Sequence, residues 1–142
     1  MIKEFQKEYR WLSNFAPCTV MFEGEKYDSV ENAYQAAKTI NPDERKWFQG
    51  VTAGKAKGLG RKIKVREDWE DIKLETMRML LAQKFSTVKY KNLLKGTGDV
   101  YIQEGNMWND KFWGICLKTE EGQNNLGKMI MEIRDIINKL EA

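Results

Sequence analysis

The segment most suggestive of chemistry is Asn106–Gly114, in which three large aromatic side chains, two asparagines and one aspartate occupy nine residues. A loop has no packing reason to carry so many rings unless it folds into the protein or holds a flat ligand. Stacking of a base on a tryptophan is worth about 1–3 kcal/mol. Trp108 and Asp110 are therefore candidates for a base-binding site, although Trp108 and Trp113 could equally serve as core anchors.

Glu31 is the second candidate, because an acidic residue near the start of a helix has two possible uses. Glu31, Gln35 and Lys38 follow one another at i, i+4 and i+7, so they form one polar stripe that resembles a wall of a polar pocket. The alternative is a capping box, in which Asp28 is the N-cap and Glu31, at N3, bonds back to the N-cap amide. Both interpretations stay open at this point.

A basic run is the third candidate. Its cations are Lys55, Lys57, Arg61, Lys62, Lys64 and Arg66. Gly54 and Gly58 lie within it, but the spacing is neither that of a P-loop nor that of a dinucleotide-binding motif. Glycines with Lys and Arg near a helix terminus suit one or two phosphates. A solvated surface is the other interpretation, and the acids of 67–71 that follow argue against a nucleic-acid patch.

The sequence contains no histidine. This excludes Ser-His and Cys-His nucleophile pairs and removes the commonest transition-metal ligand. Acid–base chemistry must then come from Asp, Glu, Lys, Tyr, Cys or bound water. Cys18 and Cys116 are far apart in sequence, so neither a disulfide framework nor a cysteine-built zinc site is expected. We expect no metal and no cofactor.

The composition is that of one ordinary globular domain over residues 1–142, with 42% hydrophobic and 32% charged residues. A formal net charge of +3 is small for a protein that binds nucleic acid mainly through phosphate charge. No window reaches the roughly 18 apolar residues that span a bilayer, and the charged N-terminus does not resemble a signal peptide. These features indicate a cytoplasmic protein without a membrane segment.

The first half of the chain is expected to form loops and short strands, followed by three short helices. The expected bounds are a strand at 19–22, a turn at 23–25, a returning strand at 26–27, and helices at 28–39, 42–50 and 52–60.

The second half is expected to be mainly helical. The expected bounds are helices at 68–85, 89–95 and 123–140, and strands at 99–103 and 115–117. Apolar residues at helical spacing mark the core faces of the two long helices: Trp69, Ile72, Met77, Leu80 and Leu81, and then Leu126, Met129, Ile130, Ile133, Ile137 and Leu140. The whole pattern predicts a helix-rich α+β fold around a small β-sheet.

Several short motifs occur in a fixed order along almost the entire chain. They are Trp11–Phe15, Tyr27–Lys38, Ala56–Arg61, Asp68-Trp69, Lys84-Phe85, Leu94, Thr97-Gly98, Glu104, Trp108–Asp110, Trp113-Gly114 and Gly122–Gly127. Together they resemble the YbiA-like family, also called NADAR for its predicted link to NAD and ADP-ribose.

The resemblance implies an enzyme that hydrolyses N-glycosidic bonds. One branch of the family acts on ribosylamino-pyrimidine phosphates, which are early riboflavin-pathway intermediates. Another branch removes ADP-ribose from guanine in nucleic acid. The carboxylates and tryptophans important in the family match Glu31, Trp69, Trp108 and Asp110. Family members often carry histidine at the position of Asn32, which puts any acid–base role of that position in doubt.

Breaking a base–ribose bond builds positive charge on the anomeric carbon, so the reaction needs a carboxylate, a positioned water and a proton donor for the leaving base. We expect Glu31 to act on the water or the sugar hydroxyls and Asp110 to act on the base side or share the sugar contact. The substrate-binding residues expected beside these two carboxylates are Trp69 and Trp108 around the base, Lys57 and Arg61 on phosphate, and Asn14, Gln35 and Lys38 along the pocket.

Two other classes of protein stay open. One is a binding module that holds ADP-ribose or a nucleotide without hydrolysis, and the other is a nucleic-acid-binding domain built on 55–66. Within the enzyme class, the substrate is either a small phosphorylated ribosyl compound or ADP-ribosylated nucleic acid. The oligomeric state is not indicated by the sequence.

Overall fold

The structure, a computed structural model that describes residues 1–141, divides into two compact units. The central unit is Asn14–Ser86, and the terminal unit combines Met1–Ser13 with the chain from Thr87 onward. The chain therefore passes from one unit to the other twice. The helix-rich α+β class is confirmed, but the strands form two separate pairs rather than one small sheet. The single domain expected over 1–142 stays a prediction.

The central unit begins with the predicted hairpin. Strand β1 (Val20–Phe22) pairs antiparallel with β2 (Glu25–Tyr27), with Phe22 opposite Glu25. The two loop residues, Glu23 and Gly24, have φ angles of 46° and 85°. Positive φ at both positions is typical of a type I′ turn, whose twist matches that of the strands, and glycine adopts it without strain.

Helix α1 (Val30–Ala36) follows, and every one of its residues is buried. Its N-cap is Ser29, whose hydroxyl accepts a hydrogen bond from the amide of Asn32, so the cap predicted at Asp28 is wrong by one residue. Glu31 is consequently at N2 and not at N3. The helix also ends before Thr39, because the amides of Lys38 and Thr39 bond three residues back and tighten the last turn.

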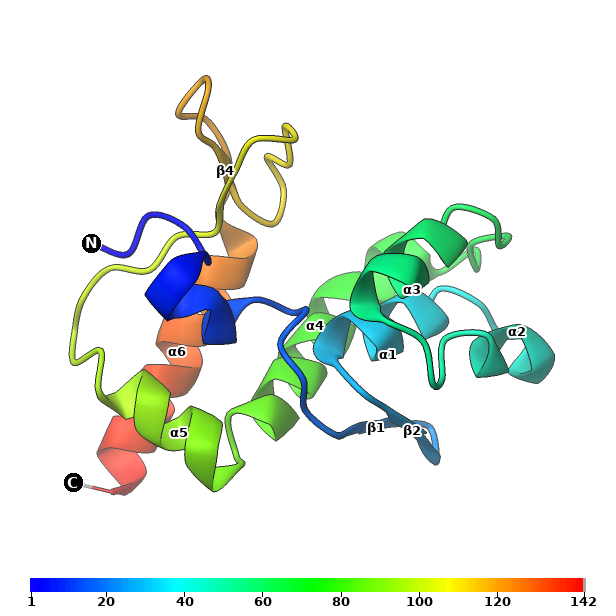
Figure 1. The fold of residues 1–142 in the computed structure, drawn as a ribbon, viewed down its shortest axis with the longest axis horizontal. Helices are drawn as coiled ribbons and strands as arrows, with labels where there is room; N and C mark the ends of the chain where they lie inside the picture. Colours follow the sequence, from blue (N-terminus) through cyan, green and yellow to red (C-terminus); the bar gives the residue numbers. More distant parts are fainter. Residues whose placement is uncertain (142) are drawn as a thin grey trace. The chain divides into compact units, whose positions relative to one another are not determined.

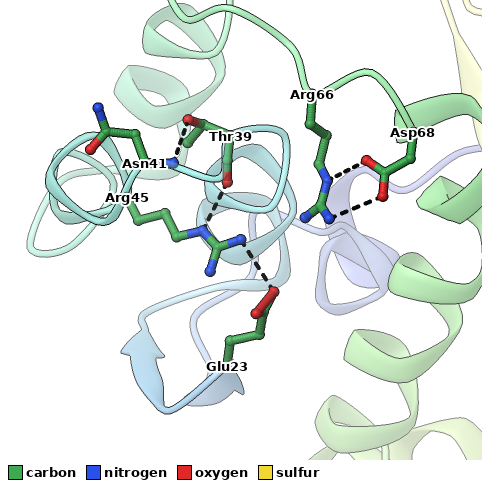
Figure 2. A network of polar contacts seen from close by, with 6 residues as sticks. All are labelled: Glu23, Thr39, Asn41, Arg45, Arg66 and Asp68. Carbon is green, nitrogen blue, oxygen red and sulfur yellow. Dashed lines mark hydrogen bonds and ion pairs between the residues drawn. The ribbon is translucent and has the colours of Figure 1, made fainter.

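Two short helices cover residues 42–59. Helix α2 (Pro42–Lys46) starts with proline at N1, as predicted, but ends at Lys46 and not near Gly50. Figure 2 shows its anchor: Arg45 donates to the carbonyl of Thr39 at 2.9 Å and pairs with Glu23 at 3.2 Å. Helix α3 (Ala53–Leu59) is capped by the Thr52 hydroxyl, which accepts from the Lys55 amide.

The long helix α4 (Trp69–Lys84) lies within one residue of its predicted bounds, with Asp68 and Phe85 as its caps. Helix α1 packs against α3 and α4, and β1 contacts both α1 and α4 (Figure 1). The predicted core side chains of α4 are buried, except for Ile72, which is half-buried. Lys84 is also fully buried, which the apolar pattern did not indicate.

The terminal unit contains one 3₁₀ helix, η1 (Lys7–Leu12), where loop or strand was expected. Helix α5 (Val88–Lys95) ends at Gly96 as predicted. Strands β3 (Gly105–Asn106) and β4 (Ile115–Cys116) form a short parallel pair. Helix α6 (Asn125–Leu140) buries the first part of its predicted stripe and leaves Leu140 81% exposed, so the stripe is core only in its first turns.

The strand predicted at 99–103 does not form. Ile102 makes only an isolated bridge with Ile2. Its amide donates to the sulfur of Met131 and its carbonyl accepts from the side chain of Asn124. Side chains therefore form the hydrogen bonds with the Ile102 amide and carbonyl that a neighbouring strand would otherwise form.

Among residues 1–141, no helix is long and apolar enough to cross a membrane.

Candidate functional site

The polar stripe of α1 forms the centre of the candidate site in the central unit. Glu31 is 8% exposed and Gln35 is 5% exposed. The Gln35 amide nitrogen donates to Glu31 Oε2 at 3.4 Å. The i, i+4 spacing that predicted a common face is thus realised as a direct contact between the two side chains.

Lys38 completes the stripe at the C-terminal end of α1. Burial lowers the pKa of its ammonium, and the neighbouring Glu31 carboxylate partly offsets that effect. Lys57, Lys73 and Arg61 lower the pKa of Lys38 further, because each adds positive charge nearby. The charge of Lys38 is therefore affected by the buried carboxylate of Glu31 and by three other cations. The structure brings Lys57 and Arg61 close enough to Lys38 to act on its charge.

Lys73 was not among the residues expected from the sequence. It lies on α4, one helical turn after Trp69, and forms an ion pair with Glu70 on the same helix. Its i+4 relation to Trp69 is the signal that could have identified it, since both then point to the same side of α4. Only the packing of α4 against α1 makes its charge part of the site.

An aromatic pair accompanies the charged groups. The rings of Tyr34 and Trp69 are 5.1 Å apart and tilted by 59°. The Lys38 ammonium lies 5.5 Å from the centre of the Tyr34 ring, within the range of a cation–π contact. Trp69 is only 7% exposed, so most of its surface packs inside the protein. The edge of the Trp69 ring is therefore more accessible to a ligand than the face of the ring.

Asn14 is tied to the start of α1 by its main chain. Its carbonyl accepts from the Glu31 amide at 3.1 Å. Its side-chain nitrogen donates to the sulfur of Met77 at 3.6 Å, whereas its side-chain oxygen is buried without a hydrogen-bond partner. A buried acceptor without a partner is costly, so this oxygen is suited to a donor on a ligand or a water.

Asn32 has a structural role. Its side-chain nitrogen donates to the carbonyls of Phe48 and Val51, both at 2.9 Å, and its side-chain oxygen accepts from the Ser29 hydroxyl. All the polar atoms of the side chain are engaged in fixing the loop after α2 to the start of α1. The residue at this position therefore supports α1 and has no polar atom left for proton transfer.

The rest of the basic run is mainly a solvated surface. Lys55, Lys62 and Lys64 are exposed. Arg66 pairs with Asp68 through two contacts, at 2.6 and 3.1 Å, which raises the pKa of Arg66 and lowers that of Asp68 (Figure 2). Of this run, Lys57 and Arg61 are the cations that act on the charge of Lys38.

In the terminal unit, the aromatic segment Asn106–Gly114 folds around two polar side chains. The Asn106 side chain donates to the carbonyl of Asp110 and accepts from its amide, at 2.9 and 3.0 Å. Asp110 Oδ1 in turn accepts from the amides of Phe112 and Trp113. One carboxylate oxygen of Asp110 thus holds the loop in shape.

Trp108 lies at the tip of this loop and is 56% exposed. The core-anchor interpretation is therefore wrong for Trp108, whereas Trp113 is half-buried and contacts Phe112 edge to face at 4.8 Å. An exposed tryptophan on an ordered loop is suited to stacking against a flat ligand. Trp108 and Asp110 thus belong together on one loop of the terminal unit, and the other predicted site residues belong to the central unit.

Over residues 1–141, the structure contains no group of three or more Cys, Asp or Glu side chains that could hold a metal ion. Cys18 and Cys116 are both free thiols. Burial raises the pKa of Cys18, although the nearby Lys84 and a hydrogen bond from the Val30 amide lower it.

Comparison with known proteins assigns the family. The model of the NADAR domain matches residues 2–138. The chain is 32% identical over 139 residues to an N-glycosidase of Nostoc punctiforme, covering 93% of this chain and 88% of that protein. It is 29% identical over 132 residues to the N-glycosidase YbiA of Escherichia coli, covering 90% and 81%.

Two further similarities extend the comparison. A riboflavin biosynthesis protein of Vibrio vulnificus is 32% identical over 136 residues, and the chain spans 36% of its length. The NMR structure of Escherichia coli YbiA superposes with a TM-score of 0.82 at 28% identity, covering 100% of this chain and 90% of that one. The chain belongs to the NADAR domain family.

Proposed function

We propose that this protein is an N-glycosidase that hydrolyses the bond between a base and the ribose of a phosphorylated ribosyl compound. The observation that carries the proposal is the buried carboxylate of Glu31, which accepts a hydrogen bond from Gln35 and acts on the nearby cation Lys38, whose charge Lys57, Lys73 and Arg61 also affect. The N-glycosidases among the relatives support the reaction class.

The charges of the site match what the reaction needs. As the bond to the base breaks, positive charge grows at the anomeric carbon of the ribose, and a nearby carboxylate stabilises it. Glu31 would do this and would also orient the attacking water. The departing base takes up negative charge and then a proton. Lys57, Arg61 and Lys73 provide the positive charge that suits the phosphate of the substrate.

The preferred substrate class is a ribosylamino-pyrimidine phosphate of riboflavin biosynthesis, and the similarity to the riboflavin biosynthesis protein of Vibrio vulnificus supports it. The second candidate is ADP-ribosylated guanine in nucleic acid. The exposed cations Lys55, Lys62 and Lys64 flank the site residues in sequence and would suit a polymer backbone. The two free thiols agree with a reducing compartment, and we expect the reaction to occur in the cytoplasm.

The test is the release of free base and ribose phosphate from both substrates. The wild type is compared with Glu31→Gln, which keeps the shape of the side chain and removes its charge, and with Glu75→Gln, an exposed carboxylate of α4, as the matched control. We expect Glu31→Gln to lower kcat at least 100-fold with little change in binding, and Glu75→Gln to be unaffected.

The outcome also separates the competing classes of protein. If wild type and Glu31→Gln cleave either substrate equally well, Glu31 is not catalytic and the proposed site is wrong. Binding of ADP-ribose with no cleavage of either substrate would make the protein a binding module. Salt-sensitive binding to unmodified nucleic acid, with no cleavage, would favour a nucleic-acid-binding domain built on 55–66.

A further inference from the structure

The side-chain amide of Gln35 is enclosed between a carboxylate and a glycine. Its nitrogen donates to Glu31 Oε2, and its oxygen is buried without a hydrogen-bond partner. The residue is 5% exposed, so water does not readily reach this oxygen. A buried acceptor without a hydrogen-bond partner is energetically unfavourable. Some other interaction must therefore keep the amide in this orientation.

The charge of Glu31 provides that interaction. If the amide were reversed, its oxygen would face Glu31 Oε2, and two acceptors would meet without a proton between them. The observed orientation places the amide nitrogen, a donor, toward the carboxylate instead. It is the favourable orientation as long as Glu31 is ionised. A protonated Glu31 would favour the reverse, because the amide oxygen would then accept its proton.

The position of the amide depends on the absence of a side chain at residue 60. A Cβ built on Gly60 would lie 2.0 Å from Gln35 Oε1 and 2.8 Å from Gln35 Cδ. The backbone of Gly60 has φ −59° and ψ −19°, which every residue adopts readily. Glycine is therefore not needed here for its conformational freedom. It is needed because the Gln35 amide occupies the space of a Cβ.

The charged groups around this pair come from three elements. Lys38 follows α1, Lys57 belongs to α3 and Lys73 to α4, and Arg61 follows α3 and its cap. Elsewhere around α1, Glu23 pairs with Arg45, Glu25 accepts from Gln49, and Glu44 and Arg45 bond to Thr39. Substitutions at 35 and 60 leave all of these charges in place.

We propose that Gln35 is a positioning residue that keeps the Glu31 carboxylate ionised and oriented, and that Gly60 is retained to give the Gln35 amide its place. The catalytic meaning of this inference rests on the proposed function, whereas the effect on the ionisation of Glu31 does not. Loss of a hydrogen bond to the charged form raises the pKa of a carboxyl group. Displacing Gln35 should therefore make Glu31 take up a proton at higher pH.

Two variants test the inference. Gly60→Ala displaces the amide without removing any polar group, and Gln35→Met removes the amide at similar volume. Gly58→Ala is the matched control, because a Cβ at Gly58 meets nothing within 4 Å. The ionisation of Glu31 is followed by ¹³C NMR of its side-chain carboxyl, assigned with Glu31→Gln. The pH profile of kcat/KM is measured in parallel, and thermal unfolding establishes that each variant is folded.

We expect the midpoint of the NMR titration of the Glu31 carboxyl to rise by about 0.5–1 pH unit in Gly60→Ala and in Gln35→Met. In Gly58→Ala the midpoint should not change. The acid limb of the pH profile of kcat/KM should move to higher pH by the same amount. An unchanged midpoint in both folded variants overturns the inference, even if the enzyme is active. A shifted midpoint in a protein that cleaves neither substrate supports the inference and refutes the proposed function.

Discussion

The buried side chain of Lys84 should make the stability of this protein increase between about pH 8 and pH 10.5. Lys84 has no exposed surface, and burial lowers the pKa of its ammonium from 10.5 to about 8, with the neighbouring Cys18 offsetting part of the effect. In this pH range the folded protein has released the proton of Lys84 and the unfolded chain still binds it. The free energy of unfolding therefore rises with pH over this range.

The size of the effect follows from the change in pKa. One pH unit corresponds to about 1.36 kcal/mol, so the shift of Lys84 corresponds to roughly 3 kcal/mol of stability gained across the range. Cys18 acts in the opposite direction, because burial raises the pKa of its thiol. Both effects are present in the wild type. Replacing Lys84 with methionine, which has similar length and no charge, removes the contribution of the lysine together with its effect on the pKa of Cys18.

The measurement is urea unfolding, followed by tryptophan fluorescence, at intervals from pH 7 to pH 10.5. The free energy of unfolding of Lys84→Met is subtracted from that of the wild type at each pH; without Lys84 the pKa of Cys18 is higher still, which changes the difference in the same direction. We expect the difference to rise by roughly 3 kcal/mol in favour of the wild type. For the control Lys139→Met, at an exposed site on α6, the difference in the free energy of unfolding from the wild type should not change with pH. A constant difference for Lys84→Met would refute the reasoning.

Two more substitutions test individual contacts. Ser29→Ala removes the N-cap of α1 and should lower the free energy of unfolding by about 1–2 kcal/mol in urea titrations. Asp28→Ala should have little effect. A larger loss of stability in Asp28→Ala than in Ser29→Ala would show that Asp28 is the cap. Asp110→Asn keeps an oxygen that can accept from Phe112 and Trp113, so it should leave the loop folded. A fall in kcat of tenfold or more in this variant would show a catalytic role for the charge, and unchanged kcat would limit Asp110 to shaping the loop.

Much of the local structure was predictable because its causes lie within a few residues. The long helix α4 follows from apolar residues at helical spacing, and the hairpin follows from β-prone runs on either side of Glu23-Gly24. The cap of α1 was misplaced because Asp28 and Ser29 are both good N-cap residues. Only the hydrogen bond between the Ser29 hydroxyl and the Asn32 amide distinguishes them.

Elements that depend on distant partners were harder to predict. The alternation at 99–103 is that of a strand, but Met131 and Asn124 bond to the backbone of Ile102 in place of a second strand. The stripe of α6 continues to Leu140, yet burial stops earlier because neighbouring elements cover only the first turns. In both cases the local pattern was correct and the missing information was which residues would be available to pack against it.

For the site, the sequence by itself determined that Glu31 and Gln35 share one face of α1, because the helical repeat fixes which side chains are neighbours, whereas Lys38 lies just beyond the end of that helix. It also placed an aromatic loop around Trp108 and Asp110. The tertiary structure decided that Lys73 adds a fourth cation and that Asn32 is used for support. It also decided that Gly60 makes room for the Gln35 amide. These depend on how α3 and α4 pack against α1, and the spacing of residues along one helix carries no information about that packing.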